Sequence, residues 1–281
     1  MPGTLYVVAT PIGNLEDVTL RALRILREVD LIAAEDTRRT RILLTHHGIS
    51  TPVTSYYDAV ERERAPRLVA QLTAGKSIAL VSDAGTPAIA DPGYHLVRGA
   101  LEAGATVVPV PGPSSVTTVL SAAGLPAERF CFEGFLPSKA AARARKLAAL
   151  ADEERAIVLL EAGRRLGALL EAAAIALGSR HAVVGRELTK RHEEIMRGDL
   201  PALAARVRAG GGVRGEVVVL IQGRARGVQP VIAERDLDDR LRIALRAGRS
   251  VRDASAQLAG ETGLPRRLVY RRALAVAGES S

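Results

Sequence analysis

Short apolar runs alternate with helical periodicity along the first hundred residues. Short runs typical of strands, most of them apolar, occur at 5–9, 31–34, 53–57, 78–81 and 106–110. Between them, apolar residues recur at helical spacing, for example at Leu20, Leu23, Leu26 and Val29, and further helices are expected at 38–47, 65–74 and 94–103. Unalternating strands separated by amphipathic helices are typical of a parallel sheet covered on both faces. The pattern predicts an α/β domain over residues 1–118.

The alternation of strand and helix patterns is less regular in the second half of the chain. A helix over 114–123 is followed by candidate strands at 129–133, 156–160, 182–186 and 216–221, with helices between them. We therefore predict a second α/β or α+β domain over residues 119–227. After Gly227-Val228-Gln229-Pro230 the pattern is wholly helical, with a capping box at 250–253 and a turn at Gly263. Residues 235–281 are expected to form a small three-helix module that resembles a helix-turn-helix.

Composition indicates an ordinary globular protein that can bury a large core. The 281 residues are 47% hydrophobic and 25% charged, and no apolar run approaches the length of a membrane span. The opening Met1-Pro2-Gly3 lacks the basic region of a signal peptide. The lone Cys131 excludes an internal disulfide, and no Cys/His cluster has metal-ligand spacing. We expect a cytoplasmic protein with no membrane association and no metal.

The net charge of +8 is unevenly distributed. Residues 235–281 hold ten Arg and six acids and so contribute +4, while residues 139–146 (KAAARARK) add four basic groups and no acid. Such clusters are what a phosphate-binding surface needs, although a solvated helix face is the alternative for either stretch. The candidate RNA-contacting residues are Lys139, Arg143, Arg145, Arg266, Arg267 and Arg271.

Three Gly/Pro turns follow strands of the first domain, at 10–14, 82–87 and 110–115. Turns after parallel strands meet at the sheet edge where α/β proteins hold their ligands. Gly13, Gly85 and Gly112 allow a ligand to approach the backbone closely, and Ser114 and Ser115 are candidates to cap a helix whose amides favour an anion. No turn matches the common GxGxxG or GxxxxGK[ST] nucleotide motifs.

Several ordered motifs resemble one known family. They are Val8 to Leu15 (VATPIGNL), Ala33 to Arg38 (AAEDTR), Leu80 to Pro87 (LVSDAGTP), Asp91-Pro92-Gly93, Pro111 to Ser114 (PGPS), Phe132 to Pro137 (FEGFLP), Arg186 to Lys190 (RELTK) and Gly215-Glu216. Together they resemble the bacterial ribosomal RNA small-subunit methyltransferase I family, which belongs to the tetrapyrrole-methylase-like class of S-adenosylmethionine enzymes. The resemblance covers nearly the whole chain.

The resemblance implies a two-domain α/β fold with a small helical module, a homodimer, and S-adenosylmethionine held in the cleft between the domains. It also implies 2'-O-methylation of a cytidine in the decoding centre of 16S rRNA, with the free rRNA or the 30S subunit as partner. The chain departs from the family pattern at Leu160 and Arg164, where relatives carry Tyr and His. Glu161 and Arg165 of that motif are retained. Glu161 is a candidate site residue, and the alternative is a strand-end carboxylate that forms a salt bridge with an arginine.

The reaction limits the candidate roles. Asp83 is the first choice for a carboxylate that binds the donor, with further contacts expected from Pro11, Gly13, Gly85, Thr86, Gly112, Ser114, Ser115, Glu161 and Glu187. Asp36 and Glu35 are candidates to face the ribose, with Arg38 on a phosphate or base. Lys190 is a candidate to hold RNA phosphate or, if desolvated, to take the hydroxyl proton. The alternative for Asp36 and Arg38 is a helix N-terminal acid with a surface partner.

Two other functions stay open on the sequence. One is a small-molecule methylase of the same superfamily, and the other is a ribosome-assembly protein that binds RNA without turnover. The absence of Tyr and His from the family motif is the reason for considering an RNA-binding protein without turnover. A ring substrate predicts no steep salt dependence of binding, whereas an RNA substrate does.

Overall fold

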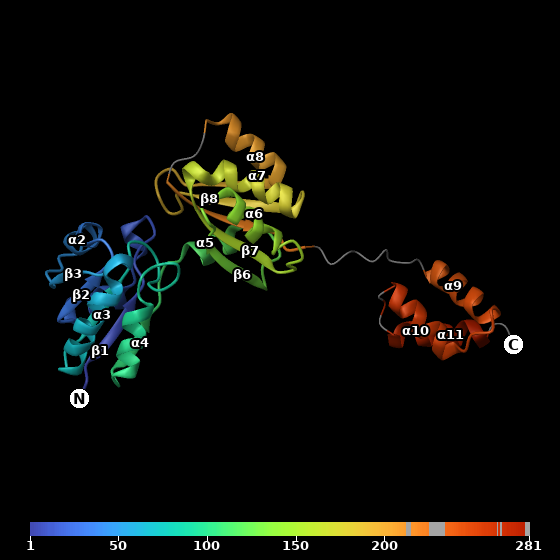
Figure 1. The fold of residues 1–281 in the computed structure, drawn as a ribbon, viewed down its shortest axis with the longest axis horizontal. Coiled ribbons are helices and arrows are strands. Elements are labelled where there is room, and N and C mark those ends of the chain that lie inside the picture. The colour runs from blue at the N-terminus through green and yellow to red at the C-terminus, as the bar shows by residue number, and fades with distance from the viewer. Residues whose placement is uncertain (212–214, 225–233, 263, 265, 279–281) are drawn as a thin grey trace. The chain divides into compact units, whose positions relative to one another are not determined.

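The computed structural model describes residues 1–211, 215–224, 234–262, 264 and 266–278 (Figure 1). The expected linker Gly227 to Pro230 and the turn at Gly263 lie outside the described residues. The chain divides into two compact units, Met1–Arg224 and Ala225–Ser281. The first unit contains two five-stranded sheets, and we describe the second unit separately.

The first sheet has the strand order β3-β2-β4-β1-β5, and all neighbouring strands are parallel. Its strands are β1 (Thr4–Val8), β2 (Leu31–Ala34), β3 (Val53–Ser55), β4 (Ile78–Val81) and β5 (Thr106–Val110). The short apolar runs therefore form the parallel sheet that the sequence pattern predicts.

Helices cover both faces of this sheet. One face packs against α1 (Leu20–Glu28) and α2 (Thr37–His46), and the other against α3 (Asp58–Thr73) and α4 (Tyr94–Glu102). Along β4, Ala79 and Val81 join the first core while Ile78 and Leu80 join the second. Since side chains alternate across a strand, a strand that is buried on both sides carries apolar residues at every position.

Helix α3 begins at Asp58, seven residues before the expected start, and contains Pro66. Proline is over-represented at the first position of a helix, and a start at residue 65 would place Pro66 in the first turn. The extra turns carry Glu61, which is buried although it is acidic. The buried Tyr56 donates a hydrogen bond to Glu61 Oε1 at 3.2 Å, so a polar contact anchors the part of α3 that lacks apolar periodicity.

The second sheet has the order β6-β7-β10-β8-β9, in which only β6 and β7 are parallel. Its strands are β6 (Phe130–Phe135), β7 (Ala156–Ala162), β8 (His181–Arg186), β9 (Glu194–Asp199) and β10 (Glu216–Ile221). The mixed pairing agrees with the α+β alternative. Strand β9 was not expected, because an edge strand with two apolar residues, Ile195 and Met196, carries little of the pattern that marks buried strands.

Helices α6 (Ala140–Ala148), α7 (Leu166–Leu177) and α8 (Leu200–Ala209) share one core with this sheet. On the other face lies α5 (Ser115–Ala122), whose Val116 and Val119 pack with Val158 and Val218. The boundary expected near residue 118 thus falls inside α5, a helix that packs on the second sheet. Short 3-10 helices lie at Leu15–Asp17 and Gly163–Arg165.

The second unit contains α9 (Glu234–Arg246), α10 (Val251–Thr262) and α11 (Arg266–Gly278). Leu237, Leu241, Leu258, Val269, Ala273 and Val276 form its core. Arg272 donates two hydrogen bonds of 2.7 Å to the carboxylate of Asp238, which ties α11 to α9. The expected capping contact is present, since the Asp253 amide donates to Ser250 Oγ at 3.1 Å. No described helix is both long and apolar enough to cross a membrane.

Candidate active site

The turns after β1 and β4 are hydrogen-bonded to each other. The Thr10 amide donates to the Gly85 carbonyl at 2.9 Å, and the Gly85 amide donates back to the Thr10 carbonyl at 3.0 Å. The Thr10 hydroxyl also donates to the Ser82 carbonyl at 3.1 Å. Gly85 has a φ of +85°, a conformation that favours glycine. Two of the three predicted turns therefore form one rigid edge of the sheet.

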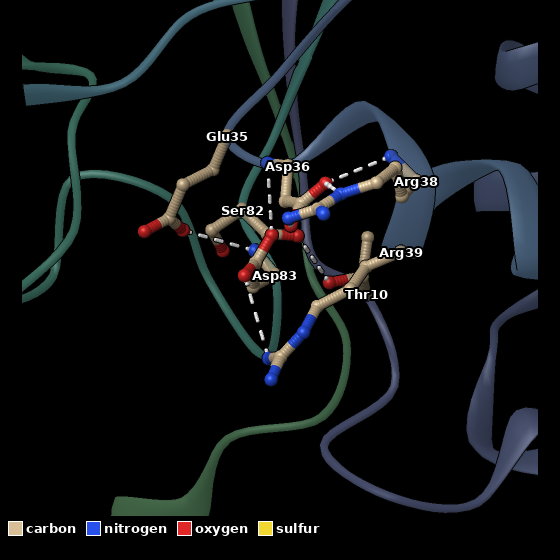
Figure 2. Close-up of polar contacts among 7 residues, drawn as sticks. All are labelled: Thr10, Glu35, Asp36, Arg38, Arg39, Ser82 and Asp83. Atoms are coloured by element: carbon tan, nitrogen blue, oxygen red, sulfur yellow. Dashed lines mark hydrogen bonds and ion pairs between the residues drawn. The ribbon is translucent and has the colours of Figure 1, made fainter.

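Carboxylates after β2 and β4 bind each other's backbone (Figure 2). The Asp36 amide donates to Asp83 Oδ1 at 2.9 Å, and the Asp83 amide donates to Glu35 Oε2 at 3.1 Å. Arg39 Nη1 lies 3.4 Å from Asp83 Oδ2. Burial raises the pKa of Glu35, and the charge of Asp83 raises it further. Because β2 and β4 are adjacent parallel strands, their carboxyl ends bring these groups together.

Asp36 itself caps helix α2. Its Oδ1 accepts hydrogen bonds from the Arg38 amide at 2.8 Å and from Arg38 Nε at 3.1 Å, and Oδ2 accepts from Nη2 at 2.8 Å (Figure 2). The hydrogen bonds from Arg38 lower the pKa of Asp36 to about 2. The structure therefore places Asp36 and Arg38 in the arrangement that the sequence left open as an alternative, a helix N-terminal acid with a surface partner.

A cavity of about 360 Å³ lies between the two sheets of the first unit. Nine of the predicted site residues line it: Glu35, Asp83, Gly85, Thr86, Ser114, Ser115, Glu161, Glu187 and Lys190. Pro11 and Gly13 line an adjoining hollow of about 330 Å³ that shares Arg39, Asp83 and Lys190 with it. Asp36 and Gly112 line neither, and a Cβ built on Gly112 would lie 3.1 Å from the Cβ of Ala9.

Acidic side chains outnumber basic ones in the lining of this cavity. Its lining includes the six acids Glu35, Asp83, Asp91, Glu161, Glu187 and Glu216, and the two bases Arg39 and Lys190. Lys190 Nζ is held 3.0 Å from Glu187 Oε1. Within the described residues, no three His, Cys, Asp or Glu side chains are grouped to hold a metal ion. An excess of carboxylates in an enclosed space favours a cationic ligand.

Glu161 contributes an acceptor without a partner. Its side chain is fully buried, and Oε1 accepts hydrogen bonds from Arg165 Nε at 2.7 Å and the Ala162 amide at 2.8 Å. The second oxygen, Oε2, is buried and accepts no hydrogen bond. A buried acceptor left unsatisfied is costly. A bound molecule with an N–H or O–H group would satisfy it, because Glu161 lines the cavity.

The loop 187–193, which follows a strand of the second sheet, contacts the turn after β1 in the first sheet. Thr189 Oγ1 accepts a hydrogen bond of 3.1 Å from the Asn14 amide, and a Cβ on Gly13 would lie 2.5 Å from Lys190 Cγ. Glu187 and Thr189 have φ values of +49° and +65°. Residues other than glycine are strained in this region and gather at functional sites.

Several lining residues were not anticipated as site residues, among them Arg39, Asp91, Phe132 and Phe135. Asp91 belongs to a quoted motif, Asp91-Pro92-Gly93, but stands in a loop after the expected turn. Phe132 and Phe135 come from β6, on either side of an irregularity in its register. A signal for Phe132 and Phe135 was present, because the chain has three Phe in total and two of them fall in the FEGFLP motif.

The residues proposed for RNA differ in exposure. Lys139 and Arg145 are exposed at α6, as are Arg267 and Arg271 on α11. Arg143 is buried, donates to the Ser138 carbonyl at 3.3 Å, and has no hydrogen-bond partner at Nε. The side chain of Arg266 lies outside the described residues.

S-adenosylmethionine fits the chemistry of this cavity. The molecule carries a sulfonium and an ammonium group, which match the acidic lining, and hydrogen-bond donors, which match the vacant acceptor of Glu161. The volume also falls in the range of about 300–1,000 Å³ that is common for small-molecule pockets. Asp83, Ser114, Ser115 and Glu187 supply further polar groups.

Comparisons with known proteins identify the fold and the family of the chain. Residues 4–204 match the Tetrapyrrole (Corrin/Porphyrin) Methylases, and residues 232–277 match the RsmI C-terminal HTH domain. Among solved structures, a uroporphyrin-III C-methyl transferase from Thermus thermophilus, complexed with S-adenosyl homocysteine, is 20% identical with a TM-score of 0.55 and covers 78% of this chain and 97% of its own. Diphthine synthase is 17% identical with a TM-score of 0.58, over 78% of this chain and 90% of its own.

Sequence relatives are much closer. A protein named ribosomal RNA small subunit methyltransferase I from Synechocystis sp. is 47% identical over 97% of this chain and 98% of its own length. Its namesake from Escherichia coli O157:H7 is 47% identical over 97% of this chain and 95% of its own length. With both matched regions in order, the chain belongs to the ribosomal RNA small subunit methyltransferase I family of S-adenosylmethionine-dependent methyltransferases.

Proposed function

We propose that this protein methylates 16S rRNA at the ribose 2'-hydroxyl of a cytidine in the decoding centre. Relatives at 46–47% identity over almost the entire chain are named as methyltransferases of small-subunit ribosomal RNA. The observation that carries the proposal is the acidic cavity at the joined turns, which has an unsatisfied buried carboxylate oxygen. The cytidine and its 2'-oxygen rest on the family resemblance of the motifs.

The bound donor supplies an electrophilic methyl group on a positively charged sulfur. Asp83 is suited to bind its cationic part, because the Asp36 amide and Arg39 already fix the orientation of that carboxylate. Glu161 offers Oε2 to an N–H or O–H donor, and Ser114 and Ser115 lie at the start of α5. The protein's contribution is chiefly alignment of the reacting atoms.

The two departures from the family pattern fall in different places. Leu160 lines the cavity, so the absence of a phenol there makes this wall more apolar. Arg164 is exposed and is not among the lining residues. The missing imidazole therefore removes no group from the cavity wall, and we propose that turnover is retained.

The C-terminal helices are proposed to hold the RNA. Arg267 and Arg271 are exposed on α11, within the region that matches an HTH domain. Phosphate contacts give affinity and position without reading sequence. The homodimer and the cytoplasmic location implied by the resemblance remain predictions.

The proposal is tested by incubating the purified chain with radiolabelled S-adenosylmethionine and one of three acceptors. These are naked 16S rRNA, 30S subunits and a tetrapyrrole precursor. We expect label in RNA, at a ribose that becomes resistant to alkaline cleavage. Label only in the tetrapyrrole would identify a small-molecule methylase, and label in none would favour an RNA-binding protein without turnover.

Donor binding is tested separately by calorimetry. The Asp83→Ala variant should bind S-adenosylmethionine more weakly, because it loses the oriented carboxylate. Asp152→Ala is the matched control, since Asp152 is highly exposed and pairs with Arg224 at the surface. Unaltered affinity of Asp83→Ala would remove Asp83 from the donor site.

A further inference from the structure

The loop between β4 and α4 contributes two carboxylates to the cavity, that of Asp83 near its start and that of Asp91 near its end. Ala88 and Ala90, which precede Asp91, have φ values of 66° and 62°. Neither is glycine, so the loop is strained at two positions just before Asp91. Strain of this kind persists only where the surrounding structure imposes it.

Glu61 imposes the conformation of this loop from behind. Its Oε1 accepts hydrogen bonds from the Gly93 amide at 2.9 Å, the His95 amide at 3.0 Å and the hydroxyl of Tyr56 at 3.2 Å. The Ala88 amide donates to the Pro92 carbonyl at 3.3 Å, which closes the loop on itself. The backbone before and after Asp91 is therefore held by hydrogen bonds from groups that do not line the cavity.

The surroundings of Asp91 are polar on one side and apolar on the other. Ser82, Glu35, Asp83 and Glu216 are the polar groups near its carboxyl group that influence its pKa. Ile89, Phe132 and Phe135 line the same cavity, and residues Ile89 and Phe135 are more than half exposed. Exposed aromatic and aliphatic groups at a pocket are suited to stacking on an unpaired base.

We propose that Asp91 is the catalytic base, which accepts the proton of the ribose 2'-hydroxyl as the methyl group is transferred. This assignment rests on the proposed function. The hydroxyl oxygen forms a bond to the methyl carbon, the carbon–sulfur bond breaks with its electron pair staying on sulfur, and the hydroxyl proton passes to a carboxylate oxygen of Asp91. The products are a methyl ether, a neutral thioether and a carboxylic acid, so atoms and charge balance.

The acid–base properties of Asp91 suit this role. Burial is the main cause that raises its pKa to about 7, and the negative charge of Glu35 adds to the effect. A base with a pKa near the working pH is both ionised and able to hold a proton. The other charged groups that line the cavity are Arg39, Asp83, Glu161, Glu187, Lys190 and Glu216.

The other candidates for the proton are already engaged. Asp36 is paired with Arg38, with its pKa lowered to about 2, and is not in the cavity lining. Glu35 accepts the Asp83 amide, and Lys190 is paired with Glu187. Asp91 combines a place in the cavity with a weakly acidic carboxyl group.

The experiment compares wild type, Asp91→Asn, Asp91→Glu and the surface control Asp152→Asn. Single-turnover methylation is measured with saturating donor across the pH range, and donor affinity is measured by calorimetry. We expect Asp91→Asn to slow transfer by about 10²- to 10⁴-fold, to lose the rise of rate with pH, and to keep its donor affinity. Asp91→Glu should recover a pH-dependent rate.

A second readout needs no donor or RNA. A raised carboxyl pKa means that the folded protein binds the proton more tightly than the unfolded chain does, so ionisation destabilises the fold. The melting temperature of apo Asp91→Asn should therefore exceed that of wild type by an amount that grows as the pH rises through about 4 to about 7. Asp152→Asn should show no such trend.

The outcomes separate the two claims. A wild-type protein that methylates no RNA refutes the proposed function and this assignment with it. An active wild type with an equally active Asp91→Asn refutes the assignment alone. A loss of donor affinity that accounts for the slower rate would make Asp91 a donor-binding residue and overturn the proposal. A difference in melting temperature between Asp91→Asn and wild type that does not change with pH would show that the Asp91 carboxyl group titrates normally, and this would also overturn the proposal.

Discussion

The pairing of Glu161 with Arg165 shows how one ion pair can serve both fold and site. The Glu161 side chain has no exposure, the Arg165 side chain is 30% exposed, and their closest atoms are 2.6 Å apart. A buried pair of this kind contributes little net stability while intact, but removing one partner leaves a charge without compensation. Arg165 therefore fixes the carboxylate of Glu161 in place beside the cavity.

Arg165→Met should lower the free energy of unfolding by about 3–5 kcal/mol, because the buried carboxylate loses its cation. Urea denaturation followed by circular dichroism measures the change. Arg24→Met is the matched control: Arg24 pairs with Glu28 at an exposed site, with side chains 58% and 56% exposed. Its expected effect is about 0.5 kcal/mol or less. Equal losses in both variants would contradict this account.

Among single residues, the site residues that directly follow strands could be predicted from the sequence. Glu35 and Asp83 lie just beyond the ends of β2 and β4, so a parallel sheet brings them together. Asp91 could not be assigned in this way, because its place depends on how Glu61 holds the loop and not on a strand end. The capping role of Asp36 was visible only as an alternative, since a cap and a catalytic acid share the same residue type.

Among the elements, the loop 187–193 and the turn at 10–14 pack closely against each other. Besides Lys190 Cγ, a Cβ on Gly13 would meet Thr189 Oγ1 at 2.7 Å and the Leu188 carbonyl oxygen at 2.8 Å. These distances are shorter than side chains tolerate, so one loop would have to move. Gly13 is needed for close packing and not for its own conformation.

Gly13→Ala should cost about 1–3 kcal/mol of stability through overpacking, and it should weaken S-adenosylmethionine binding because Lys190 and Glu187 move with their loop. Unfolding and calorimetry measure the two effects. Gly167→Ala is the control: its Cβ would meet Val207 Cγ1 at an ordinary 3.7 Å inside α7. Alanine there should stabilise the helix by about 0.5–1 kcal/mol and leave binding unchanged. Unchanged binding in Gly13→Ala would argue against the loop as a part of the site.

Elements were predictable where apolar residues are continuous or periodic. The expected strand at 106–110 coincides with β5, and that at 78–81 with β4. Strand β9 and the start of α3 were missed, since their polar residues are fixed by neighbours distant in sequence. The antiparallel pairing in the second sheet also lay beyond the pattern, because apolar runs do not encode strand direction.

For the whole molecule, the distribution of charge matters more than its total. Residues 235–281 supply +4 of the net +8. Part of this charge is structural, since Arg272 is bonded to Asp238. Arg267 and Arg271 lie exposed on the same helix. In this module Arg272 links two helices, whereas Arg267 and Arg271 are exposed to solvent.

The charge distribution predicts how salt affects RNA binding. Replacing both Arg267 and Arg271 with Gln should flatten the slope of log K against log salt by about 1.4, at roughly 0.7 for each phosphate contact with single-stranded RNA. Deleting residues 235–281 should flatten it by about 3.5 if five side chains meet phosphates. Arg98→Gln, on α4, is the control and should leave the slope unchanged. A constant slope in the deletion would exclude the C-terminal unit from the RNA interface.

The lone Cys131 has a practical consequence for following this protein in solution. Its thiol is buried at the second sheet, and burial raises its pKa, so little thiolate forms at neutral pH. Native protein should therefore react slowly with maleimides, as mass spectrometry can check. A cysteine introduced by Leu274→Cys, at an exposed position of α11, would then carry a single fluorophore in a protein whose native thiol reacts slowly. Energy transfer to a dye on the RNA would report the approach of the C-terminal helices during each turnover.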